Sequence, residues 1–419
     1  MKTTFRLSMR NLVRNRVRTG LSVGGIAVAA IMLIFNLGFI GGFYDMMIRG
    51  STEVEIGHVQ VQHRDYVERP STLDYLEWDS ELSEALTGAR EVRAVAPRVR
   101  LFGLVGHEER SQVGRIVGVD PSAERSVTVI ADGVREGRWL SEEIEAGGVA
   151  EAVIGRGLAR SLGVGVGDEL VVIAEGADGS MGDALLEIVG IVQTGSPVWD
   201  RSGVLLHLEE AQYIAAMEGA VHEVVIALRD PGRSIPVARE LQARVDAAGR
   251  EHLAVRPWEE VNTGLYEMLN LGNQSNYIIF LVIAFIVALG VLNALRMSAR
   301  ERSREFGVML AMGMARRKLF SMVMIEGAVL GVAGAVVGGI VGGLMTWYFA
   351  VYGLNMGAFL EGDTTYMGIS FSEEIYFVLT AGSVLGTTIG LVMVTMLCAL
   401  WPAVWSIRLN PRDAITGRQ

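Results

Sequence analysis

One short motif in the chain has the residue types and spacing of a catalytic nucleophile. Gly20-Leu21-Ser22-Val23-Gly24 matches G-x-S-x-G, in which the serine occupies a sharp turn between a strand and a helix. Here the serine stands at the start of a long apolar run, where a membrane helix is expected instead of such a turn. We therefore assign no catalytic residue to the chain.

Nucleotide hydrolysis by a P-loop requires G-x-x-x-x-G-K-[ST], because the backbone amides and the lysine hold the phosphates. The chain has two lysines, Lys2 and Lys318, and neither follows a glycine. We therefore predict a non-enzymatic chain that holds no cofactor of its own. Any ATPase that works with this chain, and binds ATP and Mg²⁺, must then be another chain.

The histidines and the cysteine predict neither a metal site nor a disulfide. None of the six histidines forms an H-E-x-x-H motif or another paired metal-ligand spacing, and all lie between residues 46 and 275. The single cysteine, Cys398, can form no disulfide within the chain.

Four stretches are nearly free of charge and long enough to cross a bilayer, since about 20 apolar residues of helix span the hydrocarbon layer. They are Leu21–Tyr44, Tyr277–Leu295, Leu319–Tyr348 and Ile375–Trp401. The first could be a signal peptide, but its 24 residues exceed the usual apolar core of about 7–15 and no A-x-A-like site closes it. An uncleaved anchor is the better interpretation.

Charge predicts the orientation of these spans. Basic residues precede the first span, separate the second from the third and follow the fourth, whereas the loop Val351–Glu374 has four acids and no base. Loops rich in Lys and Arg stay in the cytoplasm, so both termini are predicted to be inside. The block from Met46 to Ser275 is then extracytoplasmic. Its 21 basic and 38 acidic residues exclude nucleic acid as a natural partner.

The exported block has the pattern of a mixed α+β domain. Val92–Val105 and Gln112–Val119 alternate as a strand pair, and Glu223–Leu228, Ile235–Ala248 and Leu253–Val255 predict a strand, a helix and a strand. We expect an inserted subdomain at about 135–216, in which Ile154–Leu162 is helical. Apolar residues recur at helical spacing after Pro257, which predicts a stalk at 258–275 leading into the second span.

The loop between the second and third spans predicts a short amphipathic helix. Phe306, Met309, Leu310 and Gly313 fall at i, i+3, i+4 and i+7, and charged residues flank this apolar face. Attachment to the lipid surface and docking to a cytoplasmic partner explain that pattern equally well.

The third span raises two further questions. Its glycines repeat at four-residue spacing, which allows close helix packing either within one subunit or between two. Glu326 lies inside this span, and a carboxylate there is a candidate functional residue.

Several longer runs resemble the FtsX-like permeases of the MacB type. They include Arg302-Ser303-Arg304-Glu305-Phe306-Gly307, Leu310-Ala311-Met312-Gly313, and the ends Arg10-Asn11-Leu12-Val13-Arg14-Asn15-Arg16 and Asn410-Pro411-Arg412-Asp413-Ala414-Ile415. Within this superfamily the exported block resembles the lipoprotein-release permeases LolC and LolE, through Val92-Arg93-Ala94-Val95-Ala96-Pro97 and Leu162-Gly163-Val164-Gly165-Val166-Gly167-Asp168.

The resemblance implies four transmembrane helices with a large α+β extracytoplasmic domain of the MacB periplasmic-core type. The implied sequence of segments is 1–20 cytoplasmic, 21–45 span one, 46–275 periplasmic, 276–296 span two, 297–318 coupling helix, 319–349 span three, 350–374 periplasmic loop, 375–404 span four and 405–419 cytoplasmic tail.

The resemblance also implies partners and sites. A cytoplasmic ABC ATPase dimer would dock on the coupling segment. A second permease subunit, identical or related, would complete the membrane-spanning part of the transporter. The implied coupling residues are Arg304, Glu305, Phe306, Met309, Leu310, Met312 and Gly313. A cavity for acyl chains would be lined by Phe35, Phe39, Phe43, Met47, Met268 and Leu271.

The implied activity is ATP-driven release of lipoproteins from the inner membrane by mechanical transmission to the periplasmic domain. A periplasmic carrier would receive the lipoprotein, but the stretch Glu175–Ala184 is short where a carrier-recruiting permease has a projecting hairpin. Two alternatives stay open: a MacB-like efflux permease for peptides or amphiphiles, and FtsX-like signalling to a cell-wall hydrolase.

Overall fold

The computed structural model describes residues 10, 16–66, 73–142, 149–355, 365–366, 369–370 and 374–410. The chain divides into a helical unit (Met1–Asp45, Leu269–Asn355, Glu373–Gln419) and an α+β unit (Met46–Met268, Met356–Ser372). Much of the predicted N-terminal segment 1–20, of the loop 350–374 and of the tail 405–419 lies outside the described residues.

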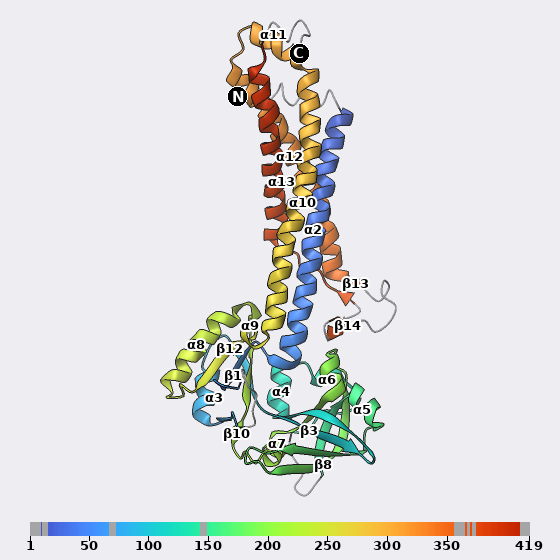
Figure 1. Cartoon of the computed structure of the whole chain (residues 1–419), viewed down its shortest axis with the longest axis vertical. Coiled ribbons are helices and arrows are strands. Elements are labelled where there is room, and N and C mark those ends of the chain that lie inside the picture. The colour runs from blue at the N-terminus through green and yellow to red at the C-terminus, as the bar shows by residue number, and fades with distance from the viewer. Residues whose placement is uncertain are drawn as a thin grey trace. The chain divides into compact units, whose positions relative to one another are not determined.

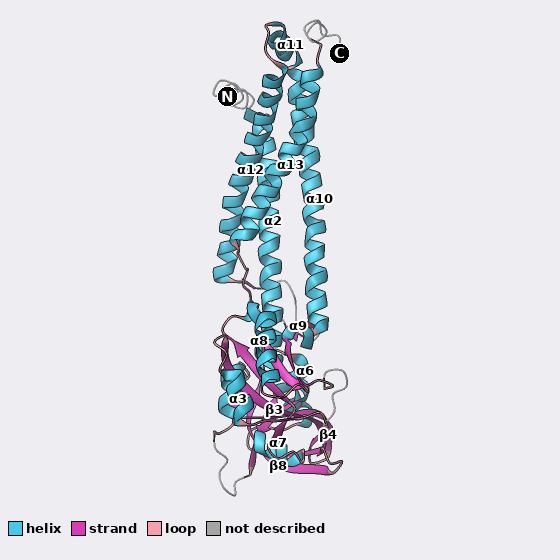
Figure 2. Ribbon diagram, turned by 90° about the vertical axis from the view of Figure 1, so that its left-hand side faces the viewer, coloured by secondary structure: helices cyan, strands magenta, loops and turns pink. Residues whose placement is uncertain are grey.

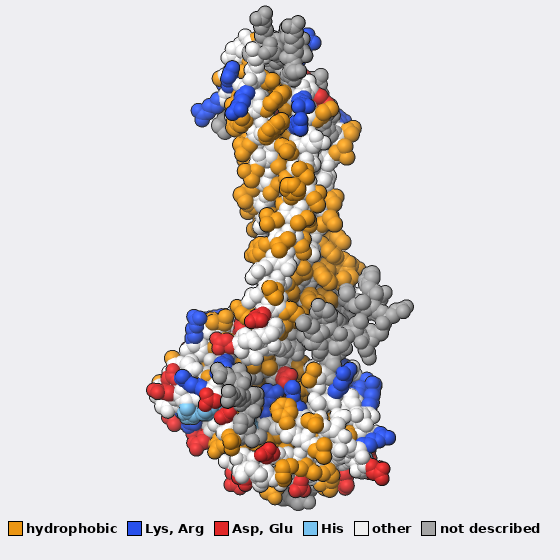
Figure 3. All heavy atoms as spheres, viewed as in Figure 1, with side chains coloured by type: hydrophobic (Ala, Val, Ile, Leu, Met, Phe, Trp, Pro, Cys, Tyr) orange, Lys and Arg blue, Asp and Glu red, His pale blue; other side chains and the backbone are white. Residues whose placement is uncertain are grey.

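The helical unit contains long helices that run side by side (Figures 1 and 2). They are α2 (Arg16–Ser51), α10 (Thr263–Glu301), α12 (Arg316–Tyr352) and α13 (Ala381–Arg408), with the short α11 (Ser303–Ala311) between α10 and α12. Within the described residues, four helices are long and apolar enough to cross a membrane, which confirms the predicted spans. Hydrophobic side chains cover this unit, and Lys and Arg gather at its α11 end (Figure 3).

Several glycines of α12 are packing positions within this one chain. An added Cβ at Gly338 would lie 2.5 Å from the carbonyl oxygen of Ala27 in α2, and Gly334 meets Ile26 of α2 in the same way. Gly331 approaches Thr395 of α13 on another face. Contacts inside one subunit therefore account for these small residues.

The α+β unit is built on a ten-stranded sheet in which β12, β1, β11, β3, β4, β9, β6, β8 and β5 are neighbours in that order, and β7 pairs with β3 and β8. The strands are β1 (Val59–His63), β3 (Val92–His107), β4 (Arg110–Val119), β5 (Val134–Gly137), β6 (Ala150–Gly155), β7 (Glu169–Glu175), β8 (Met181–Val192), β9 (Gly203–His207), β11 (Glu223–Leu228) and β12 (Leu253–Pro257).

Short helices pack around this sheet: α3 (Ser80–Thr87), α4 (Pro121–Val127), α5 (Arg156–Leu162), α6 (Pro197–Ser202), α7 (Leu208–Ile214), α8 (Ser234–Ala247) and α9 (Trp258–Val261) (Figure 1). The predicted hairpin is confirmed as β3 and β4, and the predicted strand–helix–strand as β11, α8 and β12. The predicted α+β class is therefore confirmed.

The stretch predicted as an inserted subdomain extends the main sheet. Strand β9 pairs in parallel with β4, and Ile154 and Leu170 belong to the same buried cluster as Val59 and Val224. The predicted helix at Ile154–Leu162 begins only at Arg156, because Ile154 is a buried residue of β6. A buried strand and a buried helix turn have the same short apolar pattern.

The two strands that adjoin the membrane helices are neighbours in the sheet. Strand β1 follows α2 through η1, a π-helix at Thr52–Ile56, and β12 precedes α9 and α10. They pair antiparallel, with Val59 opposite Pro257. The stalk predicted as one helix is interrupted at Asn262, whose φ of −113° and ψ of 68° are not helical.

The packing of α12 predicts the effect of enlarging its glycines. Gly338→Leu should destabilise the helical unit by about 1–3 kcal/mol, the usual cost of overpacking, because its side chain would meet the backbone of α2. Gly343→Leu is the matched control, since an added Cβ there meets nothing within 4 Å. Thermal unfolding in detergent measures both, and equal melting temperatures would contradict this packing.

Candidate functional site

Helix α11 turns its apolar face toward its own chain. Phe306 is 1% exposed and packs in a buried cluster with Leu319 and Met322 of α12 and Ala403 of α13. Met309 and Leu310 are half-buried against the same cluster. The Phe306 side chain therefore anchors α11 to its own chain, and the coupling role of this segment stays a prediction.

Arg302 holds the beginning of α11. Its Nη1 donates to Glu326 Oε1 at 2.7 Å, its Nε donates to Glu305 at 3.2 Å, and its guanidinium lies 5.1 Å from the centre of the Phe306 ring. Glu326 is buried, so the ion pair compensates a charge that is costly inside a span. Sequence reasoning missed Arg302, although a carboxylate within a span calls for a nearby cation.

The opposite side of α11 is exposed, so it is the side that a partner chain could reach. Arg304, Glu305, Val308, Met312 and Gly313 are exposed. Met312 is 75% exposed, and Gly313 ends the segment with a φ of 89°, a conformation that favours glycine. This outer surface, with the exposed residues Arg316, Arg317 and Lys318 after it, has a small apolar centre and a basic edge.

The aromatic residues predicted to line a lipid cavity are packed against other aromatic rings of the helical unit. Phe35 lies 5.0 Å from the ring centre of Phe377 and 5.8 Å from that of Phe349, and Phe39 lies 5.6 Å from Phe377. Phe43 stacks on Phe39 with ring centres 6.5 Å apart. These contacts come from α12 and the segment before α13, which the sequence analysis did not include.

The remaining predicted cavity residues are in unlike environments. Met47 is buried, Met268 is half-buried and Leu271 is exposed. Helices α2 and α10 come into contact beside them, since an added Cβ at Gly272 would overlap the Tyr44 hydroxyl. The two helices approach closely at that level, and the cavity stays a prediction.

His63, Asp65 and Asp74 bring three metal-capable side chains together, with ligand atoms all within 4.8 Å of one another. The His63 Nδ1 atom lies 3.7 Å from Asp65 and 3.8 Å from Asp74, and it also accepts the Asp65 amide N–H. Asp65 is largely exposed. These are the distances of ordinary ion pairs, so we assign the group no function.

The family follows from two regions of the sequence. Residues 19–244 match the family described as MacB-like periplasmic core domain, and residues 277–411 match the FtsX-like permease C-terminal family. The chain belongs to the ABC-transporter permeases of the FtsX and MacB type. The predicted resemblance is thereby confirmed.

Three curated relatives illustrate the range of this family. The chain is 23% identical to the lipoprotein-releasing system transmembrane protein LolC of Neisseria meningitidis, over 86% of this chain and 83% of the relative. It is 22% identical to LolE of Haemophilus influenzae, over 94% and 92%. It is also 24% identical to the pyoverdine export protein PvdT of Pseudomonas syringae, over 68% of this chain and 40% of that protein.

The two sides of α11 predict different consequences of substitution. Met312→Asp should reduce co-purification of the partner ATPase at least tenfold, because it places a charge at the apolar centre of the exposed side. Phe306→Ala should instead destabilise the permease by about 3–5 kcal/mol, the cost of emptying a buried aromatic site.

Met181→Asp is the control for Met312→Asp, since Met181 is similarly exposed but lies on strand β8. Undiminished ATPase binding by the Met312 variant would place the docking surface elsewhere.

Proposed function

We propose that this chain is the permease subunit of an ABC transporter that releases lipoproteins from the inner membrane. ATP and Mg²⁺ bind to a separate ATPase dimer, and this chain transmits the resulting movement to its α+β unit. Both termini and α11 are on the cytoplasmic side, and a second permease subunit completes the transporter.

The observation that carries the proposal is the extent of similarity to LolC and LolE. Both alignments include more than four fifths of this chain and of the relative. The match to PvdT includes 40% of that protein. An efflux function is therefore the second candidate.

The chemistry of the helical unit is compatible with a lipid-anchored substrate. Removing an acyl chain from the bilayer costs about 0.8 kcal/mol per CH₂ group, so release requires an energy source such as ATP hydrolysis. Phe35, Phe39 and Phe43 form a continuous aromatic cluster with Phe377, and a lipid chain would enter by displacing contacts within that cluster.

The basic end of the helical unit supports the proposed orientation. Arg316, Arg317 and Lys318 are exposed next to α11, and short basic segments favour the cytoplasmic side. An ATPase that docks on α11 would thus act on the same side as its nucleotide supply.

The test is release of a fluorescent lipoprotein from vesicles that contain this permease, its partner permease and the ATPase. We expect ATP-dependent release, and Phe43→Arg should abolish it while ATP turnover persists, because a charge against acyl chains is strongly unfavourable. Phe43→Leu should retain release. If cells depleted of the chain sort lipoproteins normally but become sensitive to exported amphiphiles, the efflux function replaces this proposal.

A further inference from the structure

A rare helix type connects the first membrane helix to the sheet. The α2 backbone continues at Ser51 into η1, and β1 begins three residues after η1 ends. Thr52, Val54 and Ile56 of η1 are buried, and Gly57 closes it with a φ of 65°. Single π-helical turns are uncommon in proteins, and many of those that do occur lie at functional sites.

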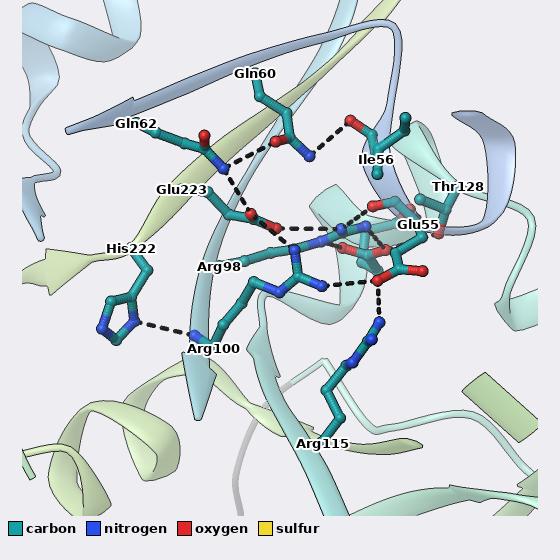
Figure 4. Close-up of polar contacts among 11 residues, drawn as sticks. Glu55, Ile56, Gln60, Gln62, Arg98, Arg100, Arg115, Thr128, His222 and Glu223 are labelled. Carbon is teal, nitrogen blue, oxygen red and sulfur yellow. Dashed lines mark hydrogen bonds and ion pairs between the residues drawn. The ribbon is translucent and has the colours of Figure 1, made fainter. Parts of the chain in front are cut away.

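One residue of η1, Glu55, is held by three arginines of the central strands (Figure 4). Arg100 Nη2 donates to the Glu55 carboxylate at 2.7 Å, and Arg115 Nη1 donates to the same oxygen. Arg98 Nη1 donates to the Glu55 backbone carbonyl. Strands β3 and β4 therefore form hydrogen bonds to both the side chain and the backbone of Glu55 in η1.

A second set of carboxylates holds these arginines in place (Figure 4). Arg98 forms a bidentate pair with Glu124, at 2.9 and 2.5 Å, and Arg100 donates to Glu223 at 3.1 Å. The six residues Glu55, Arg98, Arg100, Arg115, Glu124 and Glu223, which we call the ionic joint, carry three positive and three negative formal charges. The arrangement is neutral as a whole, so the loss of one member leaves an unpaired charge in a site that is buried at Arg98, Glu124 and Glu223 and partly buried at Glu55, Arg100 and Arg115.

Burial and electrostatics support this description. Arg98 is 3% exposed and Glu223 is fully buried. Desolvation raises the pKa of the Glu223 carboxyl, but the attraction of Arg100 and Arg98 outweighs it and leaves that pKa below its ordinary value. Glu223 is therefore ionised at neutral pH, and the joint consists of charges.

Backbone contacts fix the rest of η1. The Val129 N–H donates to the Glu53 carbonyl at 2.9 Å, and Gln60 Nε2 donates to the Ile56 carbonyl at 2.9 Å. At the start of α10, Asn262 Nδ2 donates to Ser51 Oγ at 3.1 Å, beside the helix break at Asn262. The junction of the first helix thus contains a network of ion pairs, and that of the second contains a helix break.

We propose that the ionic joint is the rigid coupling through which the first membrane helix moves the periplasmic sheet, with Glu55 as the positioning residue. Hydrogen bonds to charged groups have directional geometry, so they resist twisting and sliding, whereas apolar contacts are non-directional. The joint rests on the proposed function, since it transmits the movement that the ATPase supplies. The break at Asn262 lets α10 change its angle, while α2 transmits the movement to the sheet.

The experiment uses the complete complex in lipid nanodiscs with Glu55→Gln, which keeps the size of the side chain and removes its charge. We expect ATP turnover within twofold of the wild type and at least a tenfold loss of lipoprotein released per ATP hydrolysed. Glu151→Gln is the matched control, because Glu151 likewise accepts two guanidinium hydrogen bonds, both from Arg138, but lies on β6, outside the joint. Its release per ATP should be unchanged.

A second readout does not depend on the substrate. Val54→Cys in a Cys398→Ala background places a thiol at a buried position of η1. This thiol should stay unreactive to an impermeant maleimide during ATP turnover and become at least tenfold more reactive when Glu55→Gln is added. If the Glu55 variant fails to assemble, Arg115→Gln removes one of the bonds at the more accessible edge of the joint.

The outcomes separate the two proposals. In one outcome the wild-type complex releases no lipoprotein, but the Val54→Cys thiol becomes reactive during turnover only when Glu55→Gln is also present. That outcome overturns the proposed function and keeps the joint. Normal release per ATP and normal protection in the Glu55 variant overturn the joint. Parallel losses of ATP turnover, release and melting temperature also overturn it, because they show a purely structural role.

Discussion

A buried arginine side chain can stay in a protein interior only if neighbouring groups replace its hydration. Arg98 meets this condition with Glu124, Glu223 and the carbonyl of Glu55, and it thereby ties three separate segments of the chain to β3. Arg98 needs these partners for its own burial. Through its bond to the Glu55 carbonyl it also fixes the position of η1 at the start of the α+β unit. Replacing one partner of such a pair typically costs about 3–5 kcal/mol, so the geometry at η1 has few alternatives.

A second ion pair with a buried carboxylate lies within the helical unit. Arg302 and Glu326 connect the start of α11 to α12, while Phe306 fills the space beneath the helix. Movement of α11 by a docked ATPase would therefore be passed to the spans through directional contacts. The permease has ion pairs where α11 meets α12 and where η1 meets the sheet, and small residues, such as Gly338, where helices pack closely.

The sequence predicted the parts of this protein whose signals are local. Span lengths, the β3–β4 hairpin and the helical period of Phe306, Met309 and Leu310 follow from neighbouring residues. The direction in which Phe306 points could not be predicted, because an amphipathic helix has the same pattern whether it docks on its own chain or on a partner. The sequence also predicts the stretch 135–216 as a separate subdomain, because the pairing of β4 with β9 leaves no local pattern in the sequence.

The ionic joint could not be predicted for a related reason. Arg98 and Arg100 alternate along a strand as solvent-exposed residues would, and Glu55 and Glu223 are separated from them by 43 or more residues. The sheet register places Arg115 of β4 opposite Phe102 of β3, so Arg115 lies on the same face of the sheet as Arg98 and Arg100. Long-range pairing of opposite charges is visible only once the fold is known.

The central claim is that the end of α2 and the sheet move as one body, and a distance measurement tests it most directly. Spin labels at Arg49 in α2 and at Tyr213 in α7, both exposed, would report the distance across the joint in the complete transporter. The account predicts one narrow distance distribution that is the same without nucleotide and with trapped ATP. A distribution that shifts or broadens with ATP in the wild-type protein would contradict it.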